Sequence, residues 1–223
     1  MATRVGVVLS GCGVFDGSEI HEAVSVLIAL DKRGAQLVCM APNIAQAEVI
    51  NHAARKPASG GRNVLEESAR IARGNIRDMA TVKADQLDAL IFPGGFGAVK
   101  NLSTFASDGA RMKVNPEVAR LVGEMVKAGK PIGLACIAPV LAAAILGAQG
   151  LSPRLTIGTD KGTADAIRAM KATHVDTAAA DICVDEANRV VTTPCYMTAR
   201  GPWEVFQGAE KMVAEVLRMA EAK

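Results

Sequence analysis

The sequence predicts an α/β protein with a mostly parallel sheet and helices on both faces. Apolar runs typical of β-strands alternate with helical segments along the chain. The first run, residues 4–10, is almost continuously apolar, as expected of a strand buried on both faces. Hydrophobic residues make up 50% of the chain and aromatic ones only 3%, which suits close packing of helices on a sheet. The 223 residues fit one domain, spanning residues 1–223.

Apolar runs, helix-capping residues and the glycines and prolines that break helices predict the order of strands and helices along the chain. Strands are predicted at residues 4–10, 35–40, 88–92, 131–134 and 154–159, and helices at residues 18–33, 63–73, 116–129, 137–147, 163–172 and 203–222. Asn63 and Asn115 stand where N-caps belong, and Pro116 follows as a first helical residue. Residues 182–193 are predicted to form a hairpin, and residues 42–61 are irregular.

Composition argues against several classes of function. The net charge is +2 and no basic block with interleaved aromatic residues occurs, so nucleic-acid binding is not expected. No apolar run approaches the roughly 20 residues of a membrane span, and the N-terminus resembles a strand rather than a signal peptide. The five cysteines are scattered without a CxxC pair, which indicates neither a zinc site nor a disulfide framework. A cytoplasmic protein without bound metal is expected.

Residues 130–147 carry the most informative local pattern. A short apolar run leads into Cys136, and an Ala-rich helical run follows almost at once. A thiol at such a strand-to-helix junction is the layout of a nucleophile elbow. The positive end of the following helix is expected to favour the thiolate and lower the thiol pKa. The alternative is that Cys136 is a small buried residue of the core, since free cysteine is often buried.

Further candidate residues follow strand ends, where ligand sites lie in parallel sheets. Gly94 and Gly95 lack Cβ atoms, so their amides can approach an anion closely, although an ordinary glycine turn explains them equally well. Cys12 and Cys195 lie in loops at the same edge and are possible neighbours of Cys136.

Glu19 is the candidate proton carrier. On a helical projection it falls on the apolar flank of residues 18–33, and a carboxylate facing protein has a raised pKa. The alternative is a capping box, because Asp16 and Glu19 have the spacing in which Glu19 bonds back to the Asp16 amide. His21, His52 and His174 are expected to be solvated or structural.

Five segments together resemble the ElbB family, which belongs to the class I glutamine-amidotransferase-like superfamily with PfpI peptidases and the Parkinson-associated deglycase. These segments are residues 10–22 (SGCGVFDGSEIHE), 93–101 (PGGFGAVKN), 135–139 (ACIAP), 155–160 (LTIGTD) and 191–197 (VTTPCYM). The resemblance implies a flavodoxin-like three-layer sandwich, a homodimer, and a reactive cysteine paired with a glutamate. By position these are Cys136 and Glu19, with the amides of Gly95 and Ile137 as oxyanion donors and Gly94 shaping the loop.

The resemblance also implies an activity. ElbB-type proteins are described as glutathione-independent glyoxalases that convert glyoxal to glycolate without a cofactor, so a small dicarbonyl or aldehyde is the expected substrate. Peptidase relatives have a histidine where this chain has Ile137, and the deglycase has one in the strand end that reads Thr156-Ile-Gly here. Two alternatives remain open. One is a non-catalytic stress or redox protein using a reactive Cys136 thiolate, and the other is an amidotransferase-like hydrolase, which the missing histidine disfavours.

Overall fold

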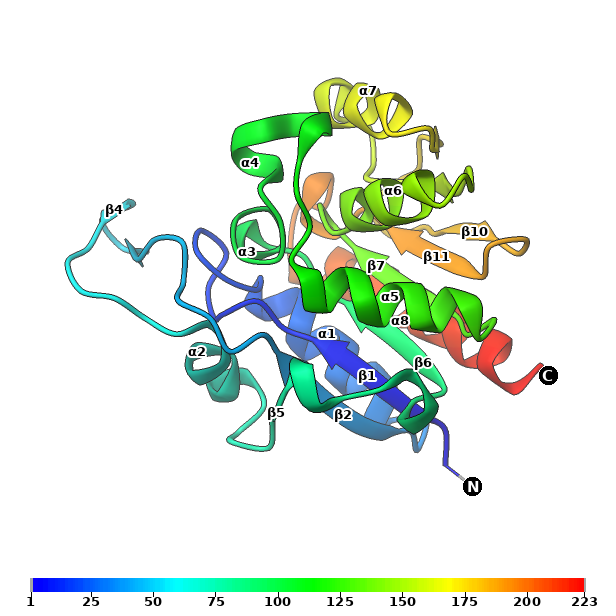
Figure 1. The fold of residues 1–223 in the computed structure, drawn as a ribbon, viewed down its shortest axis with the longest axis horizontal. Coiled ribbons are helices and arrows are strands. Elements are labelled where there is room, and N and C mark those ends of the chain that lie inside the picture. Colours follow the sequence, from blue (N-terminus) through cyan, green and yellow to red (C-terminus); the bar gives the residue numbers. More distant parts are fainter. Residues whose placement is uncertain (1, 223) are drawn as a thin grey trace.

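A seven-stranded sheet forms the centre of the molecule (Figure 1), and the computed structural model describes residues 2–222. In spatial order the strands are β10 (Cys183–Asp185), β11 (Val190–Thr193), β7 (Ile132–Ala135), β6 (Ala89–Phe92), β1 (Arg4–Val8), β2 (Gln36–Ala41) and β5 (Arg77–Asp78). Neighbouring strands are parallel except β10 and β11, which form an antiparallel hairpin. The predicted mostly parallel sheet and its C-terminal hairpin are confirmed.

Helices cover both faces of the sheet (Figure 1). One face packs against α1 (Ile20–Asp31), α2 (Val64–Ile71) and α8 (Pro202–Glu221), and the other against α5 (Pro116–Lys127), α6 (Pro139–Ala148) and α7 (Lys161–Ala169). Each face has its own cluster of buried apolar side chains. The flavodoxin-like three-layer sandwich is therefore confirmed.

Alternation along β6 shows why the strands are apolar throughout. Leu90 and Phe92 belong to the core beneath α5 and α6, whereas Ala89 and Ile91 belong to the core beneath α1 and α8. Successive side chains of a strand point to opposite faces, so a strand covered on both sides must be apolar at every position. Burying each large apolar side chain contributes roughly 1.5–3 kcal/mol.

The helix starts expected from the sequence are present. The Asn63 side chain accepts hydrogen bonds from the amides of Leu65 and Glu66 at the start of α2. Asn115 caps α5 in the same way, and Pro116 is its first residue. Because an asparagine cap satisfies amides that the helix itself leaves without partners, these starts could be predicted locally.

Short elements account for the differences from the prediction. The strand predicted at residues 154–159 shrinks to β8 (Arg154–Leu155), which pairs with β9 (Thr173–His174) outside the main sheet. The other short elements are α3 (Phe96–Lys100), α4 (Phe105–Asp108), the hairpin β3 (Ile50–Asn51) and β4 (Lys56–Pro57), and the 3₁₀ turns η1 (Met79–Thr81), η2 (Ala84–Gln86), η3 (Gly109–Arg111) and η4 (Cys195–Met197). Elements of two to five residues are too short to show a hydrophobic period.

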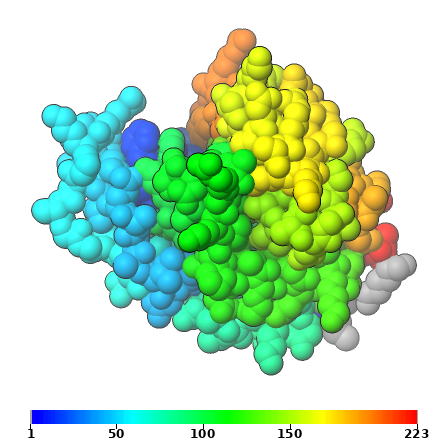
Figure 2. Space-filling model, turned by 45° about the horizontal axis from the view of Figure 1, so that its top comes forward, coloured from blue at the N-terminus to red at the C-terminus, as the bar shows by residue number. Residues whose placement is uncertain are grey.

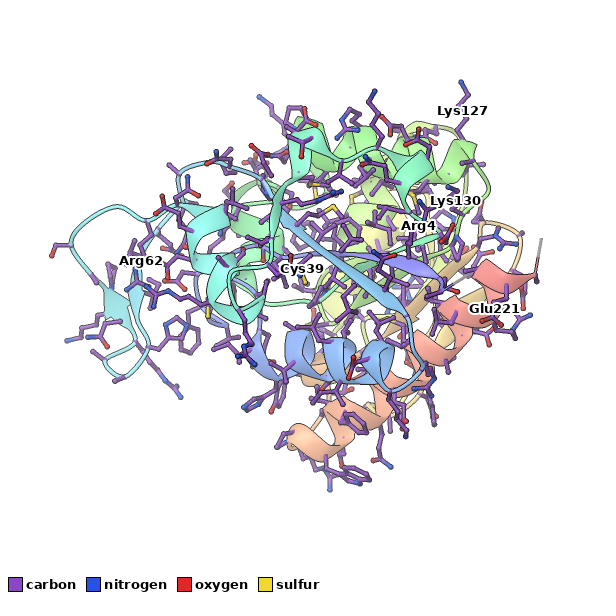
Figure 3. All side chains as sticks on the ribbon, turned by 90° about the horizontal axis from the view of Figure 1, so that it is seen from below. Arg4, Cys39, Arg62, Lys127, Lys130 and Glu221 are labelled. Atoms are coloured by element: carbon purple, nitrogen blue, oxygen red, sulfur yellow. The ribbon has the colours of Figure 1, made fainter. Side chains whose placement is uncertain are left out.

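Charged side chains form ion pairs and hydrogen bonds near the amino ends of the parallel strands. Arg4 begins β1 and pairs with Asp88 at 3.3 Å, and the Lys130 ammonium donates to the carbonyl oxygens of Ala84 and Leu87. Figure 3 labels Arg4, Lys130 and Glu221 on this side of the molecule. The opposite edge, at the carboxyl ends, carries Cys136 and the glycine loop after β6.

Candidate active site

Cys136 occupies a sharp turn between β7 and α6. Its φ of 61° lies in the left-handed region, which is uncommon and strained for a residue other than glycine. The Cys136 amide donates to the Thr193 carbonyl at 2.9 Å, and the Ala138 amide bonds back to Ala135, which tightens the turn. The predicted nucleophile elbow is confirmed, and it holds a thiol whose residue is only 7% exposed.

Gly94 lets the loop after β6 lie directly against the elbow. A Cβ atom at Gly94 would lie 2.4 Å from the Cys136 Cβ and 2.7 Å from a Glu22 carboxylate oxygen. Cβ atoms do not occur at such distances, so only glycine fits here. Gly94 therefore brings the loop, the thiol and the Glu22 side chain together.

The carboxylate beside Cys136 belongs to Glu22 of α1. One Glu22 oxygen accepts the Gly94 amide at 2.9 Å, and the other accepts the Tyr196 amide at 3.2 Å. Its side chain also hydrogen-bonds with the Cys136 thiol. Glu22 is fully buried, so these contacts fix its carboxyl group in one orientation against the sulfur.

Glu19 has a different role from the one predicted. It is the N-cap of α1, and its carboxylate accepts the Glu22 amide at 2.7 Å. The prediction that Glu19 is the partner of Cys136 is therefore wrong, and so is the alternative in which Glu19 bonds back to the Asp16 amide. The helix turns a different side to the protein than expected: Ile20, Val24 and Ile28 are exposed, and Glu22 is buried.

The electrostatics of the pair follow from its burial. Burial raises the pKa of the Glu22 carboxyl to about 8, and the negative charge of Glu19 adds to the shift. Burial and then the Glu22 carboxylate hold the pKa of the Cys136 thiol well above its usual value. The expected lowering of the thiol pKa by the helix N-terminus is thus outweighed. Two acidic groups in contact titrate as a unit, so the pair loses its first proton near pH 8.

The predicted oxyanion donors are the amides of Gly95 and Ile137. Gly95 has a φ of 98°, and its amide hydrogen-bonds with the Cys136 sulfur. Ile137 directly follows Cys136 and is half-buried. Among residues 2–222, neither amide donates to a backbone carbonyl or a side-chain oxygen. The Gly95 amide thus has the sulfur as its partner, whereas the Ile137 amide has no partner among these residues.

The other two candidate thiols lie in different surroundings. Cys195 follows the end of β11, next to β7 in the sheet, and it belongs to the same buried cluster as Cys136. Its Sγ points to the Val205 carbonyl at 3.9 Å. Cys12 instead faces the charged side chains of Glu67 and Arg70 near α2. Cys195 is thus the thiol that neighbours the Cys136 region.

Two site residues escaped the sequence prediction. The sequence prediction singled out neither Glu22 nor Tyr196, whose amide holds the Glu22 carboxylate. The Tyr196 hydroxyl also contacts His21 Nδ1 at 2.6 Å, and His21 Nδ1 lies 4.0 Å from the Glu19 carboxylate. Both Glu22 and Tyr196 lie within the segments that carry the family resemblance, which is the signal that could have found them.

The histidines do not complete a hydrolase site in the described part of the chain. His21 bonds Tyr196, His52 bonds the backbone of Phe15 and Ile50, and His174 accepts the Ile157 amide. Across residues 2–222, no group of three His, Cys, Asp or Glu side chains is arranged to hold a metal ion. In the same range, every helix is too short or too polar to cross a membrane.

Comparison with known proteins gives relatives over almost the whole chain, although no family model matches. The human glutamine amidotransferase-like class 1 domain-containing protein 3, mitochondrial, is 49% identical over 228 residues, which cover 98% of this chain and 84% of the human one. The rat ES1 protein homolog, mitochondrial, is 47% identical over 97% of this chain and 84% of its own length. Both relatives are named as mitochondrial proteins, which contradicts the cytoplasmic location expected from the sequence.

Solved structures give the same result for the fold. An isoprenoid biosynthesis protein with an amidotransferase-like domain from Ehrlichia chaffeensis is 35% identical, with a TM-score of 0.92 over 98% of this chain and 99% of its own. A DJ-1 superfamily protein from Salmonella typhimurium is 21% identical with a TM-score of 0.57, covering 97% and 91% of the two chains, and shares the fold. With its elbow cysteine and near-half identity to the mammalian proteins, the chain belongs to the glutamine amidotransferase-like class 1 (ES1) family.

Proposed function

We propose that the protein is a cofactor-independent glyoxalase that converts glyoxal to glycolate at Cys136, with Glu22 in the proton-transfer role first expected of Glu19. The observation that carries this proposal is the buried Glu22 carboxyl group, which two amides hold against the Cys136 sulfur. A buried carboxyl with a pKa near 8 can both donate and accept a proton around neutral pH.

The reaction starts from the pair with one proton, which moves from the Cys136 sulfur to the Glu22 carboxylate to give a thiolate and a carboxylic acid. The Cys136 sulfur forms a bond to one aldehyde carbon, and the Glu22 proton passes to the aldehyde oxygen, which gives a hemithioacetal and a Glu22 carboxylate. The amides of Gly95 and Ile137 stabilise the developing oxyanion. The first step therefore leaves Glu22 ready to act as a base.

The remaining steps return the pair to its starting state. Glu22 takes the C–H proton of the hemithioacetal carbon and forms an enediolate. The hydroxyl proton then moves to the second oxygen as the Glu22 proton passes to the second carbon, which gives a thioester. Water, deprotonated by Glu22, attacks the thioester, and the Cys136 thiolate leaves as glycolate is released. The sum is one glyoxal and one water for one glycolate and one proton.

Glycolate formation from glyoxal by the purified protein tests the proposal. Cys136→Ala is expected to abolish turnover, and Glu22→Gln is expected to lower it by roughly 10²–10⁴-fold, the usual size of a general acid–base contribution. Glu66→Gln is the matched control, because Glu66 is an exposed carboxylate in the first turn of α2, a different helix from the one that carries Glu22. Turnover that survives in Cys136→Ala contradicts the mechanism.

A second candidate function is a redox-responsive protein without turnover. The observation that favours it is the buried Cys195 thiol in the same cluster as Cys136. It predicts that peroxide oxidises Cys136 readily while glycolate formation stays at background. An amidotransferase-like hydrolase is the weaker candidate, because each histidine bonds groups other than Cys136.

We also propose that the protein forms a homodimer. Ile20, Val24 and Ile28 stand on successive turns of α1 and are 43%, 39% and 51% exposed. Trp203 at the start of α8, the helix that packs along α1, is 67% exposed. A second copy of the same apolar stripe is a suitable partner for it, since a twofold contact brings the same patch from both subunits together.

A further inference from the structure

A separate pocket lies between the β3–β4 hairpin, α3 and the loop that follows β1. Its volume is about 370 Å³, within the range of small-molecule sites. Phe15 and Phe96 supply its aromatic walls, Ile50 and Pro57 are apolar neighbours, and Glu48, Arg55 and Lys100 supply charge. Figure 2 shows the cyan hairpin segment beside the blue loop and the green helical region. We call this cavity the Phe15–Phe96 pocket.

Hydrogen bonds from the hairpin segment hold the pocket open in one shape. Asp16 Oδ2 accepts the Ile50 amide at 2.7 Å, and Asn101 Oδ1 accepts the Ala47 amide at 2.9 Å. His52 Nε2 accepts the Phe15 amide at 3.2 Å, and the two rings lie 5.1 Å apart. The aromatic wall is therefore fixed before any ligand arrives, which reduces the entropic cost of binding.

The charges of the pocket favour an anion. Lys100 lies 5.0 Å from the centre of the Phe96 ring and pairs with Glu48, so these two charges neutralise each other. The Arg55 guanidinium lies 5.8 Å from the centre of the Phe15 ring. Within residues 2–222, no carboxylate lies in ion-pair range of Arg55. Arg55 thus leaves one positive charge at the edge of an aromatic cavity.

Arg55 lies in the turn between β3 and β4 and carries a guanidinium. Its φ of 52° is in the left-handed region, which costs energy for a residue with a side chain. A planar guanidinium recognises carboxylate or phosphate through paired hydrogen bonds, and the two phenylalanine rings suit a flat apolar group.

We propose that the Phe15–Phe96 pocket binds a small organic anion, with its carboxylate or phosphate on Arg55 and its flat apolar part between the two rings. Phe96 directly follows Gly95, so the ligand binds beside the loop that faces Cys136. Binding does not depend on the chemistry proposed for Cys136, and Cys136→Ala protein is expected to bind the same ligands.

Calorimetric titration with four phenyl compounds tests the charge preference. Benzoate and phenyl phosphate are expected to bind at least tenfold more tightly than neutral benzyl alcohol, and benzyltrimethylammonium is expected to bind most weakly. The ratio of the two anions shows which headgroup the pocket prefers. The proposal is overturned if the neutral or the cationic compound binds as tightly as the anions.

Variants locate the binding. Arg55→Gln is expected to weaken benzoate and phenyl phosphate at least tenfold, and Phe96→Ala to weaken both several-fold. Arg73→Gln is the control, because Arg73 is also exposed and also has a φ of 52° but lies at the end of α2. Trp203→Ala controls for loss of an exposed ring elsewhere. Thermal unfolding shows whether each variant is folded. If the Arg55→Gln protein is folded and binds the anions as tightly as the unaltered protein, the proposal is ruled out.

Discussion

Glu22 is the residue on which the chemistry of the site depends. Its carboxyl is buried, and it receives two backbone amides besides its contact with Cys136. Hydrogen bonds from amides favour the charged form, yet burial and the Glu19 charge outweigh them and raise the pKa to about 8. The side chain is thus held where a proton can move between oxygen and sulfur.

The reactivity of Cys136 is expected to rise with pH through about 8, because the pair loses its first proton there. In the Glu22→Gln protein no carboxylate can accept the thiol proton, and the thiol remains buried. The midpoint of the pH profile of alkylation is therefore expected above 9, the ordinary pKa of cysteine. Alkylation by iodoacetamide, followed by mass spectrometry of the Cys136 peptide, measures both profiles. A midpoint below pH 7 in the unaltered protein contradicts the assignment.

The raised pKa of Glu22 also predicts a pH-dependent stability. A carboxyl whose pKa rises from 4.5 to about 8 on folding stabilises the fold fully below pH 4.5, and this contribution is lost as pH rises through 8. At about 1.4 kcal/mol per pKa unit, the loss is at most about 5 kcal/mol.

Urea unfolding at several pH values measures this stability. The slope of unfolding free energy against pH between 4.5 and 8 is expected to be shallower in Glu22→Gln, which has no carboxyl to titrate. Slopes are compared because the glutamine side chain cannot accept both the Gly94 and Tyr196 amides. Parallel slopes in the two proteins contradict a raised Glu22 pKa.

At the scale of elements, the site is assembled from the carboxyl ends of neighbouring strands. β7 delivers Cys136, the loop after β6 delivers Gly94 and Gly95, and the turn after β11 delivers Tyr196. The start of α1 then places Glu22 among them, because its N-cap Glu19 holds the Glu22 amide. Each segment contributes one group to the site. The distances between the packed segments therefore decide whether Glu22 contacts Cys136.

Gly94→Ala tests this close packing. The added Cβ would meet the Cys136 Cβ and Glu22, so we expect a loss of about 1–3 kcal/mol or more in stability and a loss of Cys136 reactivity. Thermal unfolding and alkylation rates measure the two effects. Gly61→Ala is the control, since a Cβ there has no heavy atom within 4 Å. Equal behaviour of the two variants contradicts the packing described for the elbow.

At the scale of the whole molecule, α1 has two functions. Its inner side carries Glu22 and the buried apolar residues, and its outer side carries Ile20, Val24 and Ile28. Exposed apolar residues in a stripe are typical of an interaction surface. The same helix therefore connects the site to the surface proposed for dimer formation.

Val24→Glu is expected to convert a dimer into monomers, because the new charge would be buried in the proposed interface without a partner. Light scattering after size-exclusion chromatography measures the mass. Glu66→Lys on α2 is the control for a charge change elsewhere. A monomeric unaltered protein, or a Val24→Glu protein that remains dimeric, contradicts the proposed interface.

The sequence by itself determined the fold class, the elbow at Cys136 and the caps at Asn63 and Asn115. These features depend on local rules: apolar runs form buried strands, a strand turning directly into a helix strains the residue between, and asparagine satisfies free amides. The glycines that follow β6 could be found for the same reason. Short elements such as α3 and β8 could not, because they lack a period.

Only the tertiary structure decided which glutamate faces the thiol. The apolar residues of α1 point outwards as well as inwards, so hydrophobic periodicity cannot say which side of the helix is buried. Glu22 is chosen because the Gly94 and Tyr196 amides, from segments far apart in the chain, converge on its carboxylate. The same burial reversed the expected pKa shift of Cys136, since desolvation and a neighbouring carboxylate outweigh the field of a helix end.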